Sequence, residues 1–303
     1  MLRSTLLFLS RQKQLRRFME TSPIAARLTR RFIAGLSLAE GLAVCRKLKA
    51  ESILATLDHL GENVTTEVEA EVSCNAYLEA VGELAKLNCG TTVSVKLTQM
   101  GLDLSEDLCR RSLERLVVRA KEVSTAVEVD MESSAHTGRT LSIVSEMHRR
   151  HGAVRAVVQA YLFRSEEDVL RLCEQGVPVR LCKGAYDEPH AIAYKSKRDV
   201  NANYLRLIKI LLERGAYPAV ASHDHTLVRA VLDHARAIGL ASDRFEFQML
   251  YGVRRELQSS LVAKGCRLRL YVPYGDAWYP YFMRRLAERP ANLLFGLRSL
   301  VRH

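Results

Sequence analysis

The stretch "TVSVKLTQMGLDLSEDLCRRSLERLVVRAKEVSTAVEVDME", residues 92–132, contains one complete unit of the predicted fold. Its two ends, 92–98 and 126–132, are short runs rich in β-branched residues, which is typical of strands. The segment 105–124 between them has a helical pattern, and Ser105 stands where an N-cap is expected. The stretch therefore predicts a strand, a helix and a second strand.

The same order recurs along the rest of the chain. Further strands are predicted at 52–61, 155–162, 177–186, 217–224, 245–250 and 267–275. Further helices are predicted at 165–176, with Ser165 as N-cap and Gly176 as C-cap, and at 201–216, ending on Gly215. Eight strands, each followed by a helix, predict an α/β protein with a (β/α)8 barrel, and the rival is a doubly wound open sheet.

The barrel is favoured because eight units fit in about 240 residues with no second domain pattern. We therefore expect an N-terminal helical arm at 1–50 and a catalytic barrel at 51–303.

Composition indicates which partners the protein can attract and in which compartment it works. The 45 Lys+Arg residues against 34 Asp+Glu leave a net charge of +11, a surplus that attracts nucleic acid, anionic lipid or a negatively charged ligand. Part of this positive charge lies in residues 11–31, which include seven basic residues and a single acidic one, Glu20. The seven cysteines are scattered without a CxxC, which is typical of reduced thiols in a cytosolic protein. The apolar opening is too short to span a membrane, and a mitochondrial transit segment is the alternative for this basic, acid-poor terminus.

Polar residues interrupt the apolar strands at regular places. In 92–98 the apolar residues alternate with Ser94, Lys96 and Thr98, so we expect this polar set to face the barrel interior. The same alternation turns Asp130 inward, and Gln159, Arg180, Gln248 and Tyr271 are further polar residues within apolar strands. A single buried polar group needs only a partner. Six of them from six strands indicate a site, because barrel interiors are normally aliphatic.

Two short motifs lie at strand ends. "ASHDHT" places His223 and His225 after the sixth predicted strand, and His-x-His can bind a divalent metal. This leaves a metal-dependent barrel hydrolase as the alternative function, although no second histidine pair completes the site. "KGAYDE" offers Lys183 and Gly184, and such a glycine lets the backbone approach a phosphate or a ring. No GxGxxG or GxxxxGK[ST] motif is present.

The segment "YVPYGDAWYPYFMRRLAERPAN", 271–292, carries a polar stripe on a predicted helix. Tyr281, Arg284, Arg285 and Glu288 stand at i, i+3, i+4 and i+7, the spacing that normally buries apolar residues. Two neighbouring arginines on one helix predict an anionic partner.

Several motifs occur in a fixed order: "TVSVKLTQMG", "VDME", "VVQAYL", "VRLCKGAY", "ASHD", "FEFQMLYGVR" and "WYPYFMRRLAERPAN". With them the chain resembles the proline dehydrogenase family, in its small single-function bacterial form, from about residue 50 to the end. The resemblance implies a distorted (β/α)8 barrel with FAD as cofactor. It implies oxidation of L-proline to Δ1-pyrroline-5-carboxylate, with electrons passed to a membrane quinone.

The resemblance also implies roles for single residues. Arg284, Arg285 and Lys96 are expected on the substrate carboxylate, and Tyr271, Tyr281 and Leu250 around the proline ring. Asp130 is expected beside Lys96 and the flavin, and Arg180 near the reactive flavin nitrogen. The remaining FAD contacts implied are Met131, Gln159, Lys183, Gly184, Ala185, Ser222 and His223. Glu62 is expected to be a gate acid that pairs with Arg284.

Two positions depart from the family pattern. Cys182 and Ser222 stand where valine and threonine are usual in the family.

The location of the enzyme in the cell can also be predicted. We expect a cytoplasmic enzyme, with peripheral contact between the basic segment 11–31 and the inner face of the cell membrane, although a solvated helix face explains that segment equally well. A pyrroline-5-carboxylate dehydrogenase is the candidate downstream partner, and no nucleic acid partner is expected.

Overall fold

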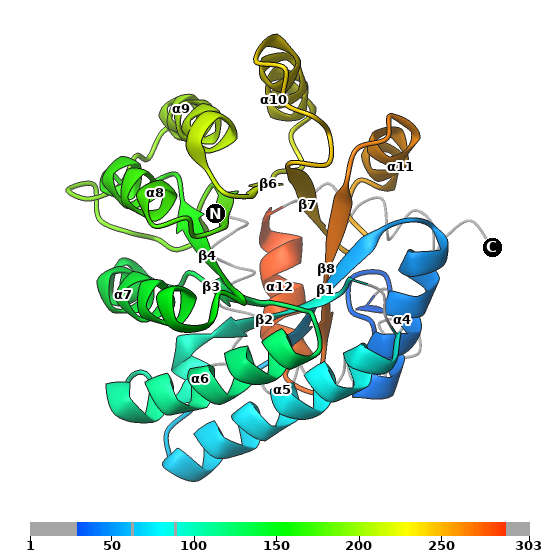
Figure 1. Cartoon of the computed structure of the whole chain (residues 1–303), viewed down its shortest axis with the longest axis vertical. Coiled ribbons are helices and arrows are strands. Elements are labelled where there is room, and N and C mark those ends of the chain that lie inside the picture. The colour runs from blue at the N-terminus through cyan, green and yellow to red at the C-terminus, as the bar shows by residue number, and fades with distance from the viewer. Residues whose placement is uncertain (1–28, 62–63, 88–89, 289–303) are drawn as a thin grey trace.

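The computed structural model describes residues 29–61, 64–87 and 90–288, without the side chains of 284 and 286–288. Within these residues, eight parallel strands form a closed barrel in sequence order (Figure 1). The strands are β1 (Leu54–His59), β2 (Thr92–Lys96), β3 (Val127–Asp130), β4 (Val154–Gln159), β5 (Val179–Cys182), β6 (Pro218–Ala221), β7 (Glu246–Leu250) and β8 (Leu268–Tyr274). The pairing of β1 with β8, from Leu54↔Arg269 to His59↔Tyr274, closes the barrel and excludes the open sheet.

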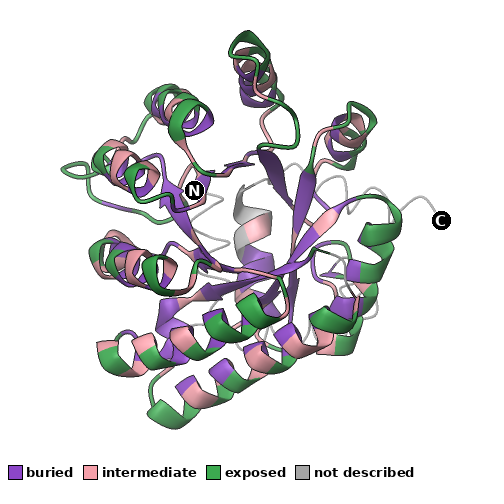
Figure 2. Cartoon of the chain, in the orientation of Figure 1, coloured by how far each residue is buried: buried purple, intermediate pink, exposed green. Residues whose placement is uncertain are grey.

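Helices surround the barrel and connect its strands. They are α4 (Leu38–Ala50), α5 (Glu67–Leu87), α6 (Glu106–Glu122), α7 (Ser134–His151), α8 (Ser165–Glu174), α9 (Lys197–Arg214), α10 (His225–Ala237), α11 (Arg255–Ala263) and α12 (Trp278–Glu288). A short 3-10 turn, Leu97–Met100, follows β2. Figure 2 shows that the strands are largely buried and that each outer helix turns one buried side toward them. This one-sided burial is the pattern that amphipathic helices produce.

Every predicted strand overlaps an observed one, and two of the three predicted helix starts differ in detail. Ser105 caps α6 as expected, because its hydroxyl accepts the Leu108 N–H at 3.3 Å. The prediction for Ser165 is wrong by one residue. Arg164 holds the N-cap position of α8, and the Ser165 hydroxyl instead donates to the Gln159 carbonyl at 2.5 Å. The α9 helix begins four residues before the predicted start, at Lys197, where Ser196 caps it.

The helix that follows the last strand does not join the outer ring. In Figure 1, α12 lies inside the outline of the barrel. Its residues pack on the carboxyl ends of the strands: Tyr281 and Phe282 share an apolar cluster with Leu60, Leu250 and Tyr271. The α4 helix covers β1 and β8 from outside, and it packs so closely at Gly41 that an added Cβ would lie 3.2 Å from Leu57 and 3.4 Å from the ring of Tyr274.

The interior of the barrel is polar, as the alternation in the strands predicts. Ser94, Arg180 and Gln248 are buried, Arg180 donates hydrogen bonds to the other two, and buried carboxylates lie among them. Aliphatic side chains instead fill the layer between strands and helices, for example Val93, Val95 and the α6 residue Leu113. The apolar core of this protein is therefore a shell around a charged centre.

Candidate active site

Polar side chains from five strands converge at the carboxyl ends of the barrel. They are Asp58 on β1, Lys96 on β2, Asp130 on β3, Arg180 on β5 and Tyr271 on β8. The register of β2 on β3 places Lys96 directly beside Asp130. Because catalytic groups of such barrels gather at this end, the cluster is the candidate active site.

Asp130 is the centre of the cluster. One of its oxygens accepts a hydrogen bond from the Arg180 guanidinium, and the other accepts from the Tyr271 hydroxyl at 2.6 Å. The Lys96 ammonium lies 3.8 Å from Asp130 Oδ2 and 3.6 Å from Asp58 Oδ1. The side chains of Lys96 and Asp130 are each 13% exposed to solvent, whereas the side chain of Asp58 is 1% exposed. A small molecule at the barrel mouth can thus reach Lys96 and Asp130.

A buried carboxylate fixes Arg180 from below. The guanidinium donates to Glu128 Oε2 at 3.1 Å, to Gln248 at 3.1 Å and to Ser94 at 3.2 Å. Burial by itself raises the pKa of Glu128, but attraction to Arg180 and two further arginines outweighs it and lowers that pKa to about 2. Glu128 is therefore ionised at neutral pH, and it holds the Arg180 side chain under the site.

The phenol of Tyr271 is kept protonated. Burial, followed by the negative charge of Asp58, raises the pKa of Tyr271 well above its usual range. The hydroxyl therefore donates to Asp130 and does not compete with it for cations. The Arg180 guanidinium also lies 5.5 Å from the centre of the Tyr271 ring, in a cation–π contact.

The α12 helix brings two more predicted residues to the mouth. Tyr281 is buried in the cluster that includes Leu250 and Tyr271, and the Arg285 guanidinium lies 5.2 Å from the centre of the Tyr281 ring. The backbone of Arg284 belongs to α12, but its side chain is outside the described part of the structure, as is all of Glu62. Whether Glu62 pairs with Arg284 therefore stays a prediction.

The expected cofactor residues lie around the ends of β3 to β6. Met131 follows β3 and is buried, and the Gln159 amide at the end of β4 donates to the Glu132 carbonyl at 2.8 Å. After β5, the Lys183 ammonium lies 3.4 Å from Asp224, and Gly184 and Ala185 come next. Gly184 has a φ of +111°, and a Cβ there would overlap the ring of Tyr161.

Ser222 and His223 complete this set after β6. The Ser222 hydroxyl accepts the Asp224 N–H at 3.2 Å. The Nε2 atom of His223 accepts the N–H of Leu250 at 2.9 Å, so this nitrogen carries no proton and the ring is held against β7. His223 therefore joins the expected cofactor side of the mouth to Leu250 on the expected substrate side.

The sequence interpretation missed Asp58 and Glu128. Both stand in strands that were predicted, and both side chains are fully buried. The signal was available: Asp58 shares the inward face of β1 with Thr56, and Glu128 shares that of β3 with Asp130. Extending the alternation used for β2 to these strands identifies both carboxylates.

The structure does not support the metal-dependent alternative. His225 is exposed at the start of α10, while His223 binds the backbone of β7 through its ring. Over residues 29–61, 64–87 and 90–288, no group of three or more His, Cys, Asp or Glu side chains is arranged to hold a metal ion. A hydrolytic metal centre needs three protein ligands as a rule.

Comparison with known proteins identifies relatives along the whole chain. The family model described as Proline dehydrogenase matches residues 42–296. Proline dehydrogenase 1 of Bacillus subtilis is 39% identical over 303 residues, covering 100% of both chains. The Proline dehydrogenase of Deinococcus radiodurans is 36% identical over 282 residues, covering 91% of this chain and 90% of the relative.

Solved structures show the same barrel within longer chains. Proline utilization A (PutA) from Bdellovibrio bacteriovorus, inactivated by N-propargylglycine, matches with a TM-score of 0.81 and 30% identity over 87% of this chain. This chain spans 33% of that protein. A variant of PutA from Bradyrhizobium japonicum matches with a TM-score of 0.76 at 22% identity, which shows the fold alone.

Proposed function

The chain belongs to the proline dehydrogenase family, and from that premise we propose that it oxidises L-proline to Δ1-pyrroline-5-carboxylate with FAD as cofactor. Membership makes it an oxidoreductase, as its full-length relatives are named proline dehydrogenases. The product, the cofactor and the electron acceptor are the parts that we propose. One observation carries the proposal: Lys96, Asp130, Arg180 and Tyr271 meet under a helix that bears Tyr281 and Arg285.

The substrate is held through its carboxylate. Arginine presents parallel N–H groups that match the two carboxylate oxygens, so Arg285 and Arg284 on α12 bind it together with Lys96. Leu250, Tyr271 and Tyr281 enclose the ring. Loss of a hydride from C5 requires a neutral amine, and positive charge on Lys96 and Arg285 disfavours a second cation at the proline nitrogen. Glu62 closes the site by pairing with Arg284.

The donors at the strand ends suit a flavin nucleotide. Gln159, Lys183 and Ser222 present an amide, an ammonium and a hydroxyl from three neighbouring strand ends, which fits the diphosphate and the ring edge of FAD. Met131, Gly184, Ala185 and His223 complete the contacts. When bound, FAD supplies the redox chemistry by accepting the hydride. Arg180 provides fixed positive charge to stabilise the negative charge that develops, and Asp130 and Glu128 hold it in place.

An absorbance spectrum of the purified full-length protein tests the cofactor. We expect flavin bands near ~450 nm that bleach when L-proline is added without an electron acceptor. A protein that stays colourless after incubation with FAD would refute the proposal. L-Alanine, which has a carboxylate but no ring, is the matched control and should leave the bands unchanged.

Two replacements at Arg285 test the substrate site. Arg285→Ala should raise KM for proline by about ten- to a hundredfold with FAD retained, because a charged hydrogen bond of roughly 1.5–3 kcal/mol is lost. Arg285→Lys keeps the positive charge but lacks the two parallel N–H groups of arginine. We expect its KM for proline to lie between that of Arg285→Ala and that of the wild type. Loss of the flavin with unchanged KM would show that Arg285 does not bind proline.

We propose further that electrons pass to a membrane quinone and that the product goes to a pyrroline-5-carboxylate dehydrogenase. None of the helices described over 29–61, 64–87 and 90–288 is both long and apolar enough to cross a membrane. We therefore propose peripheral contact, through the basic residues at 11–31, with the inner face of the cell membrane. Quinone reduction that depends on added lipid vesicles would support this route.

A further inference from the structure

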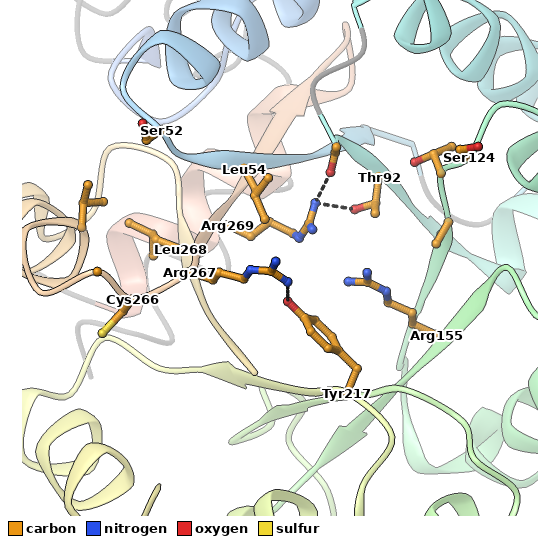
Figure 3. Close-up of a pocket in the computed structure, with 15 residues that line it drawn as sticks. Ser52, Leu54, Thr92, Ser124, Arg155, Tyr217, Cys266, Arg267, Leu268 and Arg269 are labelled. Carbon is orange, nitrogen blue, oxygen red and sulfur yellow. Dashed lines mark hydrogen bonds between the residues drawn. The ribbon is translucent and has the colours of Figure 1, made fainter. Parts of the chain in front are cut away.

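A cavity of about 740 Å³ opens at the amino-terminal mouth of the barrel, opposite the candidate active site (Figure 3). Its walls come from the first residues of strands, such as Leu54 on β1 and Thr92 on β2, and from residues just before β6 and β8, including Tyr217 and Arg267. A volume of this size is typical of small-molecule sites. The proposed oxidation of proline makes no use of it.

The walls of the cavity are strongly basic. Arg155, Arg267 and Arg269 line it, and none of the fifteen described lining residues is acidic. Two buried carboxylates, Glu128 and Glu246, lie behind the wall. Arg155 and Arg269 each form ion pairs with both carboxylates, and Glu128 also pairs with Arg180, so the three lining arginines outnumber the two carboxylates behind them. The region therefore retains positive charge next to open space.

The lining arginines differ in how many of their guanidinium nitrogens are hydrogen-bonded. Arg269 is fully engaged: it binds both oxygens of Glu246, at 2.7 and 3.1 Å, and the carbonyls of Ala55 and Gly90, at 2.8 and 2.9 Å. Arg155 uses a single nitrogen, Nη1, which lies 3.3 Å from Glu246 Oε1. Its other guanidinium nitrogens have no hydrogen-bond partner among the described residues.

Arg155 and Arg267 flank the ring of Tyr217. The Arg155 guanidinium stacks 5.3 Å from the centre of this ring, and Arg267 donates to its hydroxyl at 3.2 Å. In Figure 3 the ends of Arg155 and Arg267 point toward a common space on either side of Tyr217. Two guanidinium groups held this way form a preorganised site for an oxyanion, because their planar N–H groups match its oxygens.

We propose that this cavity binds a small anion of the phosphate class through Arg155 and Arg267. The outer helices end on this side of the barrel, and the carbonyl groups at each helix end carry a partial charge of about −0.5 that opposes an anion. Fixed cations are therefore needed for binding here, and Arg155 and Arg267 supply two. The proposal is independent of the proposed oxidation of proline, because the site lies at the other mouth.

Calorimetric titration of the full-length protein with inorganic phosphate, at constant ionic strength, tests the site. We expect saturable binding that raises Tm with phosphate concentration, as any ligand of the folded state does. Arg267→Gln should weaken binding about tenfold, since one charged hydrogen-bonding group is lost. Arg229→Gln, which removes an exposed arginine of α10, is the matched control and should bind like the wild type.

Two outcomes would overturn the proposal: no saturable heat with phosphate, or equal phosphate affinity in Arg267→Gln and the wild type. A parallel titration with glycerol 3-phosphate identifies the source of the anion. Tighter binding of glycerol 3-phosphate than of phosphate supports a phosphorylated metabolite as the ligand, with its organic part in the rest of the cavity. Equal binding supports the free ion, and in both cases Arg267→Gln must weaken the interaction.

Discussion

Glu128 shows at the scale of one residue how this barrel tolerates charge in its centre. Its carboxylate is fully buried, yet it contacts Arg155, Arg180 and Arg269 and accepts from Thr56 and Thr92. Burying an ion costs several kcal/mol unless partners of opposite charge replace water. Removing one partner of such a network is therefore more damaging than removing a surface ion pair.

The ionisation of Glu128 predicts a loss of stability in acid. Its folded pKa of about 2 lies below the ordinary value of 4.5, so the charged form stabilises the folded state fully above about pH 5. This contribution, up to about 3 kcal/mol, is lost as the pH falls from 4.5 toward 2. Urea unfolding between pH 6 and 3 should show a shallower fall for Glu128→Gln than for the wild type.

The control for this experiment is Glu174→Gln, which changes an exposed glutamate at the end of α8. We expect its stability to follow that of the wild type at every pH. Parallel curves for Glu128→Gln and the wild type would show that Glu128 does not contribute to acid unfolding.

A second prediction concerns the glycine after β5. Gly184→Ala places a side chain at a φ of +111° and into the ring of Tyr161, so we expect a loss of at least about 2 kcal/mol in unfolding free energy. Gly176→Ala is the matched control, because Gly176 also has a positive φ, +69°, but nothing lies within 4 Å. Its cost should be about 1 kcal/mol. Equal losses in urea unfolding would contradict the overlap with Tyr161.

At this scale, the sequence predicts which residues face inward but not which ones pair. Alternation along a strand is a local property, and it placed Lys96, Asp130 and Arg180 in the barrel interior. The pairing of Arg180 with both Glu128 and Asp130 depends on how β3 and β5 are offset across the barrel. That offset is set by the closure of eight strands, and no single segment encodes it.

Among the elements, α12 connects the fold to the site. Its polar stripe was predicted from spacing alone, and the structure shows that apolar residues dock the helix: Phe282 is buried against Phe32, outside the helix, at 6.2 Å between ring centres. The sequence does not reveal that α12 lies over the mouth while α4 covers β1 and β8. Both helices are amphipathic, and their places are decided by competition for the same faces of the barrel.

Phe282→Ala tests the role of this helix. Loss of the ring should loosen α12 on the strand ends and lower kcat/KM for proline at least about tenfold, because misplaced binding groups lose their orientation. Leu113→Ala, in the core between α6 and the barrel, is the control. We expect it to cost about 2–5 kcal/mol of stability and leave KM unchanged. Both variants are assayed at a temperature where circular dichroism shows them folded, and an unchanged kcat/KM in Phe282→Ala would argue against this role.

On the scale of the whole molecule, the barrel separates two charged mouths with different chemistry. The carboxyl end combines Lys96 and Arg180 with Asp58 and Asp130, so cations that attract a substrate carboxylate lie beside acidic groups that hold them in place. The amino end carries an excess of arginine, which suits an anion. Between them, Glu128 contacts both Arg155 and Arg180, so one buried carboxylate orders the two sides.

The net charge of +11 leads to a prediction for the chain as a whole. Each basic residue near an anionic surface contributes about 1 kcal/mol of attraction, and residues 11–31 hold seven of them. We expect the protein to co-sediment with vesicles that contain anionic lipid but not with neutral ones. Salt near ~1 M should release it, because the Debye length shrinks from about 10 Å at ~0.1 M to about 3 Å.

A double replacement locates the attraction. Arg16→Gln combined with Arg17→Gln should lower the binding constant for anionic vesicles roughly thirtyfold, since two attractive charges are lost. Arg229→Gln with Arg236→Gln removes the same charge from exposed positions of α10 and serves as the control. If both double variants lose binding equally, the attraction comes from the overall charge and not from the segment 11–31. Salt-independent binding would instead mean that apolar contacts, which salt does not screen, hold the protein at the membrane.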